Sequence, residues 1–298
     1  MTNRRDFLRL SAATTLATAM PAALADGPAT MDRRPIPGTD ETLSVVGLGN
    51  AVPFSEGDLD TTGRLVDILL ERGGGYIDTS FRGRFTISEV MQQRQAHDEL
   101  FVGTYLESDS AAGLADEIRA VQDAQGGGSL DLVLSRDPVS YLRRADEFQR
   151  LKEAGLARYV GVARHRKAYY PAMLEAMREG LIDFLQVNYS MLEPEAADEV
   201  LPLAAETGTA VITNRPFVNG QYFPRVRGRE LPEWAAGFDC DSWAQFSLKY
   251  ILGNPAVTCV ITETSKPRHA IDNLGAGTGR LPDAATRERM QVLLAGMQ

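Results

Sequence analysis

The sequence contains few of the residues from which metal and thiol sites are built. Its 298 residues include three histidines and two cysteines, and neither a Cys-x-x-Cys nor a His-x-x-x-His spacing occurs. We therefore expect no metal site and no framework of disulfide bonds. Basic residues are also in the minority, 31 against 40 acidic ones, which gives a formal net charge of −9. Since nucleic-acid binding requires a concentrated positive surface, no nucleic-acid partner is expected.

The remaining composition is that of a globular protein. Apolar residues make up 44% of the chain, and the 27 glycines and 15 prolines are ordinary shares. Collagen-like, disordered and low-complexity chains are thereby excluded. The length is compatible with two domains or with one α/β barrel of about 200–250 residues, so the pattern along the chain must decide.

The first 25 residues have the layout of an export signal. Three arginines (Arg4, Arg5 and Arg9) precede an Ala/Thr-rich apolar run that ends in the small-x-small triplet 23–25, Ala-Leu-Ala. The Arg4-Arg5 pair, followed by Asp-Phe-Leu, resembles the twin-arginine signal, which exports proteins that are already folded. An amphipathic anchor helix or a chance arginine pair is the alternative. We expect cleavage after Ala25, the twin-arginine export machinery as a partner, and a bacterial periplasm as the destination.

This destination bears on the two cysteines and on membrane attachment. The periplasm is oxidising, which would allow Cys240 and Cys259 to pair. Cys259, however, lies in an apolar stretch that predicts a buried strand, and buried free cysteines are common, so we expect free thiols. The apolar run of the signal is too short and too weakly apolar to span a bilayer, so no stable membrane anchor is expected.

After residue 42, short apolar runs alternate with segments of helical spacing, and residues 26–42 form a polar leader. The eight runs are predicted strands: 43–48, 76–78, 100–104, 130–134, 159–162, 184–187, 210–213 and 257–261. The predicted helices between them are 58–72, 84–93, 111–124, 142–154, 169–179, 194–207 and 241–252. Glycine follows five of these helices directly and the helix 111–124 after one residue, as a left-handed C-cap requires.

Eight nearly continuous apolar strands that alternate with helices predict a parallel sheet buried on both faces. Eight such units in about 250 residues are typical of a (β/α)8 TIM barrel, which we predict for residues 26–298 as one domain. A doubly wound open sheet is the alternative. It is disfavoured because the segment 47–52 lacks the third glycine of a dinucleotide-binding turn. In a barrel, the site is expected at the carboxyl ends of the strands.

An ordered series of segments at these strand ends resembles the aldo-keto reductases. The segments are Ser44–Gly49, Gly73–Ser80, Phe101–Thr104, Leu130–Leu132, Gly155–Val162, Gln186–Ser190 and Thr264–Asn273. The resemblance covers roughly residues 40–282 and implies an oxidoreductase that reduces a small carbonyl substrate with NADP. In that family a tyrosine donates a proton to the carbonyl, and an aspartate, a lysine and a histidine adjust its acidity.

Only the aspartate of this tetrad is present, as Asp78. The tyrosine position is Gly83, the lysine position is Tyr105 and the histidine position is Arg136. We predict an altered catalytic site of Asp78, Tyr105 and Arg136, in which the guanidinium lowers the pKa of the phenol and can clamp a carboxylate. The alternative is an inactive binding protein on the same barrel. A third possibility is that these residues are merely structural and that Arg136 pairs with Asp137.

The cofactor positions implied by the resemblance are also mixed. Gln186 matches the residue that holds the carboxamide, whereas Ala163-Arg164 replaces a Ser-Asn pair and the stacking aromatic is missing from residues 213–217. The start of the helix after the last strand suits a phosphate, although Glu263 would oppose one if it pointed inward. For His269 the alternative is an ordinary surface position. The predicted cofactor-binding residues are Gln186, Asn188, Arg215, Thr264, Ser265, Lys266, His269 and Asn273.

Overall fold

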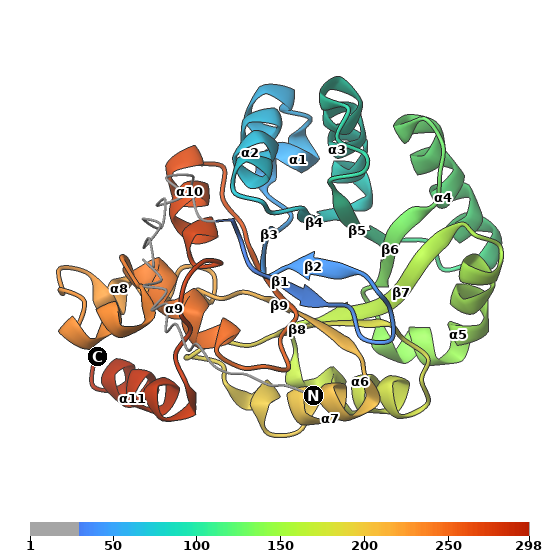
Figure 1. Cartoon of the computed structure of the whole chain (residues 1–298). Helices are drawn as coiled ribbons and strands as arrows, with labels where there is room; N and C mark the ends of the chain where they lie inside the picture. The colour runs from blue at the N-terminus through green and yellow to red at the C-terminus, as the bar shows by residue number, and fades with distance from the viewer. Residues whose placement is uncertain (1–29, 298) are drawn as a thin grey trace, which may run out of the picture.

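The structure is a computed structural model that describes residues 30–297. The predicted signal, residues 1–25 with cleavage after Ala25, lies outside the described residues. Eight parallel strands close into a barrel in the order β10-β3-β4-β5-β6-β7-β8-β9 (Figure 1). Their bounds are β3 Val46–Leu48, β4 Tyr76–Ser80, β5 Phe101–Leu106, β6 Leu130–Ser135, β7 Ala157–Arg164, β8 Phe184–Asn188, β9 Ala210–Asn214 and β10 Cys259–Thr262. The predicted (β/α)8 barrel is confirmed.

The helices surround this barrel on its outside (Figure 1). They are α1 Val52–Glu56, α2 Leu59–Glu71, α3 Phe81–Arg94, α4 Ala111–Gln125, α5 Pro138–Glu153, α6 Tyr170–Arg178, α7 Val200–Thr207, α8 Tyr222–Val226, α9 Trp243–Leu252, α10 Pro267–Gly275 and α11 Ala284–Ala295. Three short 3-10 segments accompany them: η1 Lys167–Tyr169, η2 Glu195–Ala197 and η3 Glu233–Phe238. The short helices α1 and α8 and the last helix α11 were not predicted.

Three predicted helices begin three or more residues away from their predicted first residues. Helix α3 begins at Phe81 rather than at residue 84 because the Ser80 hydroxyl accepts a hydrogen bond from the Gly83 amide. Helix α5 begins at Pro138 rather than at residue 142 because Asp137 caps it and proline suits the first turn. Helix α7 begins six residues later than predicted, and η2 takes up part of the difference.

The glycines after the helices mostly adopt the predicted conformation. Positive φ angles occur at Gly73, Gly126, Gly155, Gly180 and Gly208. Gly253 is the exception, with φ −63° at the end of α9. A side chain there would come within 2.6 Å of the Pro282 carbonyl oxygen, so glycine is required by close packing and not by a left-handed turn.

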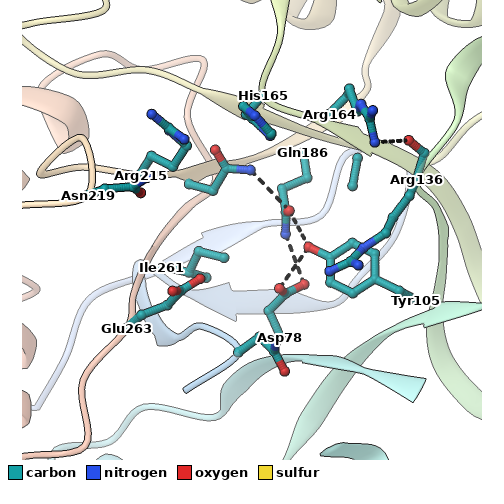
Figure 2. A pocket seen from close by; sticks show the side chains of 13 residues that line it. Asp78, Tyr105, Arg136, Arg164, His165, Gln186, Arg215, Asn219, Ile261 and Glu263 are labelled. Atoms are coloured by element: carbon teal, nitrogen blue, oxygen red, sulfur yellow. Dashed lines mark hydrogen bonds between the residues drawn. The ribbon is translucent and has the colours of Figure 1, made fainter. Parts of the chain in front are cut away.

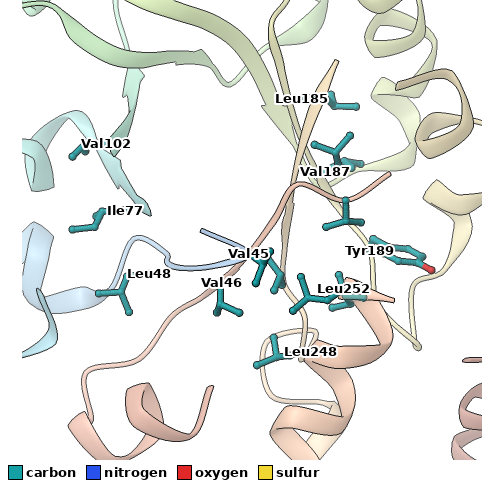
Figure 3. Close-up of a cluster of buried hydrophobic side chains, with 14 of the residues drawn as sticks. Val45, Val46, Leu48, Ile77, Val102, Leu185, Val187, Tyr189, Leu248 and Leu252 are labelled. Atoms are coloured by element: carbon teal, nitrogen blue, oxygen red, sulfur yellow. The ribbon is translucent and has the colours of Figure 1, made fainter. Parts of the chain in front are cut away.

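Two apolar clusters follow from the alternation of side chains along the strands. The outward-facing residues, such as Leu48, Ile77 and Val102, pack against the helices in the larger cluster (Figure 3). The inward-facing residues fill the barrel with tyrosine and phenylalanine: Tyr76, Phe101, Tyr159 and Phe184. The interior is therefore a packed core, as in other barrels of this fold.

A two-stranded hairpin closes the base of the barrel. Strands β1 (Arg33–Pro35) and β2 (Thr42–Ser44) pair antiparallel, and Ile36 and Leu43 are buried with the interior cluster. Arg34 donates hydrogen bonds to the carbonyls of Leu252, Asn254 and Val257, which precede β10. The prediction of a polar leader over residues 26–42 is wrong for this part, and the predicted first strand 43–48 is divided between β2 and β3.

Within residues 30–297, no helix is long and apolar enough to cross a membrane, and no group of three or more His, Cys, Asp or Glu side chains is arranged to hold a metal ion. Cys240 and Cys259 are both buried free thiols. Burial raises the pKa of the Cys240 thiol to about 11.

Candidate active site

A cavity of about 330 Å³ opens at the carboxyl ends of the strands (Figure 2). Neighbouring strands each contribute a polar side chain to it, because parallel strands end at the same rim. In chain order from β4 to β10, these residues are Asp78, Tyr105, Arg136, Arg164, Gln186, Asn214 and Glu263. The predicted catalytic residues Asp78, Tyr105 and Arg136 therefore lie together, and Gln186 and Arg215 line the same cavity.

The floor of the cavity is a buried hydrogen-bond network around Asp78. The Tyr105 hydroxyl lies 2.8 Å from Asp78 Oδ2 and also contacts Gln186 Oε1. Gln186 Nε2 donates to Asp78 Oδ1 at 2.9 Å, and Asn214 Nδ2 donates to Gln186 Oε1 at 3.2 Å. Side chains of four strands thus fix one another, which gives the phenol a defined position.

Burial governs the acidity of this network. Only 2% of Asp78 is exposed, and the loss of solvation raises its pKa to about 7, against the lowering effect of the hydrogen bonds from Tyr105 and Gln186. Burial and the neighbouring Asp78 also raise the pKa of the Tyr105 phenol well above its usual value, although Arg136 acts in the opposite direction. The prediction that Arg136 lowers the pKa of Tyr105 is therefore wrong in its net result, since the guanidinium effect is the smaller one.

The phenol has one proton but faces two acceptors. When Asp78 is protonated, its O–H can donate to the Tyr105 oxygen, and the Tyr105 proton is then directed to Gln186 or to a ligand in its place. When Asp78 is ionised, the phenol donates to the carboxylate instead. The pKa of about 7 means that both arrangements are populated near neutral pH.

Arg136 covers Tyr105, with its guanidinium carbon 4.4 Å from the ring centroid (Figure 2). The suggested Arg136–Asp137 ion pair is absent among residues 30–297, where the Asp137 carboxylate accepts the amides of Val139 and Ser140 as the cap of α5. Arg136 is therefore positioned by the aromatic ring, and its side chain lines the cavity.

The predicted cofactor residues other than Gln186 and Arg215 do not line this cavity. Asn188 points away from the cavity and donates to Glu193 Oε2 at 2.7 Å, and Glu193 also pairs with Arg215 at 3.6 Å. Five others do not line the cavity: Thr264, Ser265, Lys266 and His269 lie around the start of α10, and Asn273 lies in its last turn. Lys266 is the N-cap residue of α10 and makes no side-chain cap bond, so it leaves the first amides of this helix uncapped. Their cofactor contacts stay predictions.

A second cavity of about 240 Å³ adjoins the first and shares Arg215, Asn219, Ile261 and Glu263 with it. Its other walls are apolar and include Phe217 and Phe223. The two cavities form one groove that runs from the network to the loop after β9. Glu263 does point into this groove, and its stem lies against Gly49, where a β-carbon would approach Glu263 Cγ to 2.7 Å.

Sequence reasoning missed three contributors to the site. Asn214 ends β9, and the position of a polar side chain at a strand end was a signal for it. Tyr76 donates to Asp78 Oδ1 at 3.4 Å, and its spacing of two residues in one strand places it on the same face. Asn50 binds the Ser80 amide at 2.9 Å and fixes the rim between β3 and α3.

The fold and the position of the site define a (β/α)8 barrel protein with a polar pocket at its carboxyl end. The sequence matches the Aldo/keto reductase family over residues 55–290. The chain therefore belongs to the aldo/keto reductase family, a family of oxidoreductases that act on small carbonyl compounds.

Individual relatives are distant. A D-threo-aldose 1-dehydrogenase from a Pseudomonas species is 29% identical over 136 residues, which are 41% of this chain and only 40% of that protein. The aldo-keto reductase AKR11C1 from Bacillus halodurans, in its holo form, is similar with a TM-score of 0.71 and 20% identity, over 88% of this chain and 96% of that one. An aldo/keto reductase from Klebsiella pneumoniae in complex with NADP and acetate has a TM-score of 0.67 and 14% identity, over 90% and 95% of the two chains.

Proposed function

We propose that this protein is an NADP-dependent reductase of a small carbonyl compound, in which Tyr105 is the proton donor. The observation that carries the proposal is the phenol of Tyr105 at the cavity floor, held between the carboxyl group of Asp78 and the amide of Gln186. The family match supports an oxidoreductase, and the Klebsiella relative in complex with NADP supports the cofactor.

The residues in the groove fit a nicotinamide nucleotide. Among residues 30–297, three buried polar atoms of the cavity wall lack a partner: Asn214 Oδ1, Arg215 Nε and Arg164 Nε. The first can accept from a carboxamide and the second can donate to a phosphate oxygen. We propose that Gln186 and Asn214 hold the nicotinamide and that Arg215 and the start of α10 hold the phosphates. When bound, the cofactor supplies the hydride.

In the proposed reaction, the chain supplies the proton. As a carbon–hydrogen bond forms at the carbonyl carbon, the Tyr105 O–H bond breaks and its proton moves to the carbonyl oxygen, which becomes a hydroxyl. The proton of Asp78 moves to the phenol oxygen, so Tyr105 stays neutral and Asp78 is left as a carboxylate. Arg136, above the ring, stabilises the negative charge that develops on the two oxygens.

The first test is titration of the purified protein with NADPH, followed by fluorescence. No binding at millimolar cofactor would exclude the reductase. In turnover assays, Tyr105→Phe and Arg136→Ala should each lower the rate, whereas Tyr170→Phe and Arg143→Ala, outside the cavity, should not. Unchanged rates in the first pair would remove the assigned roles. Because protonated Asp78 is the proton source, the rate should fall as the pH rises through about 7.

A binding protein without catalysis is the second candidate. Gly83, at the family's tyrosine position, is enclosed so closely that a β-carbon would lie 2.4 Å from Thr79 Oγ1, so this site has no room for the usual proton donor. If NADPH binds and no carbonyl compound is reduced at any pH from 5 to 8, this second candidate is favoured.

We further propose export to the periplasm through the twin-arginine route. The proposal rests on the Arg4-Arg5 pair and the triplet before the predicted cleavage site. Cell fractionation should find the processed protein in the periplasm, and replacement of both arginines by lysine should leave it unprocessed in the cytoplasm. Processing that is unaffected by this replacement would refute the proposal.

A further inference from the structure

The cavity concentrates positive charge on one side. Arg136 and Arg164 come from the ends of β6 and β7, with His165 next to them, and Arg215 follows β9. The acidic side chains of the cavity are Asp78 at the floor and Glu263 on the wall after β10. Figure 2 places Glu263 on the far side of Asp78 from Arg136, so the arginines of β6 and β7 lie on one side of the cavity, and Arg136 acts on both carboxylates through space by lowering their pKa values.

The protein leaves these arginines without acidic partners. Within the part of the chain that the structure describes, neither Arg136 nor Arg164 forms an ion pair. The Arg164 guanidinium donates only to the Arg136 carbonyl at 3.2 Å and the Tyr169 hydroxyl at 3.4 Å, and its buried Nε has no partner. Arg215, by contrast, has Glu193. Two guanidinium groups therefore share one rim with unused hydrogen-bond donors.

The pKa of His165, next to Arg164, is affected by the same positive charges. Burial lowers the pKa of His165, and the nearby Arg215, Arg164 and Arg166 lower it further, against the weaker opposite effect of Glu193. Asp78, with a pKa raised to about 7, offsets little of this charge below neutral pH. An anionic group on a ligand would compensate it.

We propose that the substrate carries a carboxylate on the carbon next to its carbonyl group, and that Arg136 holds this carboxylate with help from Arg164. The inference rests on the proposed function in taking the Tyr105 phenol as the partner of the carbonyl oxygen. Because the Arg136 guanidinium lies over the Tyr105 ring, a ligand atom on the phenol is close to the edge of the guanidinium. A planar 2-oxo carboxylate places two carboxylate oxygens on that edge and the carbonyl oxygen on the phenol.

Glu263 sets the orientation of such a substrate. Its carboxylate opposes an anion on the β10 side of the cavity, so the carboxylate of the substrate is directed to the β6–β7 side. A hydroxyl group on the other end of the substrate could donate to Glu263. The class of substrate is thus a short 2-oxo acid whose remaining chain is neutral or hydroxylated.

The test uses oxamate, a 2-oxo acid analogue that a reductase cannot reduce, and its neutral amide, oxamide. Each is titrated calorimetrically into the full-length protein, with and without saturating NADPH. We expect oxamate to bind at least tenfold more tightly than oxamide. Arg136→Met should weaken oxamate at least tenfold and leave oxamide unchanged, Arg136→Lys should restore part of the affinity, and Arg143→Met, on the exposed surface of α5, should bind as the wild type does.

The outcomes separate this inference from the proposed function. Equal affinity for the two ligands, no oxamate binding in either state, or full affinity in Arg136→Met would overturn the carboxylate site. If inorganic phosphate displaces oxamate and binds as tightly as oxamate does, the site is a general anion site, and the choice of a carboxylate is overturned. If the protein, with NADPH, reduces methyl pyruvate at least as fast as pyruvate, the proposed reductase activity stands and this inference fails. If oxamate binds through Arg136 but NADPH does not bind, the inference stands and the reductase fails.

Discussion

Replacing Asp78 by asparagine removes a carboxyl group whose proton binding changes on folding. Its pKa is raised from 3.8 to about 7 by burial at the cavity floor. Because the folded-state pKa lies above the unfolded-state value, the bound proton favours the folded protein at low pH. This contribution is fully present below about pH 4 and is lost as the pH rises to about 7.

The size of the effect follows from this difference. Each pKa unit corresponds to 1.36 kcal/mol, so the complete contribution is about 4 kcal/mol. Between pH 5 and pH 8 the part that is lost is about 3 kcal/mol, a large fraction of the 5–15 kcal/mol that is typical for the free energy of unfolding. Asparagine is of the same size and does not titrate, so it removes the pH dependence while it keeps the side-chain volume.

The assay is urea unfolding of the wild type and Asp78→Asn at pH 5, 6, 7 and 8. The difference in unfolding free energy, wild type minus variant, should fall by about 3 kcal/mol from pH 5 to pH 8. Other titrating groups act equally in both proteins and cancel. Asp98→Asn, on the exposed surface, controls for the loss of one carboxylate. A difference for Asp78→Asn that is constant across this range would show that Asp78 is ionised in the folded protein and would refute the reasoning.

Three further predictions concern stability. Phe184→Ala should lower the free energy of unfolding by about 3–5 kcal/mol because Phe184 fills the barrel interior, and a loss below about 1 kcal/mol in urea would contradict this packing. Ser44→Ala should cost about 1–3 kcal/mol, since the buried hydroxyl accepts the amides of Gly75 and Tyr76; an unchanged melting temperature would argue against this link. Arg84 is 1% exposed, and burial lowers its pKa to about 10 while the side chain of Gln125 is its hydrogen-bond partner. Arg84→Met should therefore raise the melting temperature, and a clear decrease would refute a cost of burying this charge.

The barrel was predictable because each unit is encoded locally. The apolar run of a strand, the spacing of the following helix and the glycine after it are all visible within about 30 residues. The hairpin at the base was not predictable in this way. Ile36 and Leu43 stand among polar residues, and their burial depends on aromatic side chains of strands far along the chain, such as Phe184.

The sequence predicted which catalytic residues lie together in the candidate site, but it did not predict the direction of their pKa shifts. Family position and strand ends indicated Asp78, Tyr105 and Arg136, which lie together. The direction of the pKa of Tyr105 depends on how deeply the phenol is buried, and sequence spacing contains no measure of burial. Asn188 shows the same limit, because its turn toward Glu193 is decided by the path of the loop after β8.

The contacts of Arg34 have a consequence for the order of events in folding. This residue of β1 is bonded to the carbonyl of Asn254, 220 positions further along the chain, and β3 pairs directly with β10. A growing chain therefore has two unpaired strand edges and an open base until the segment through residue 262 has left the ribosome. Folding should therefore be slow, and fragments that end before β10 should aggregate instead of forming a smaller stable barrel.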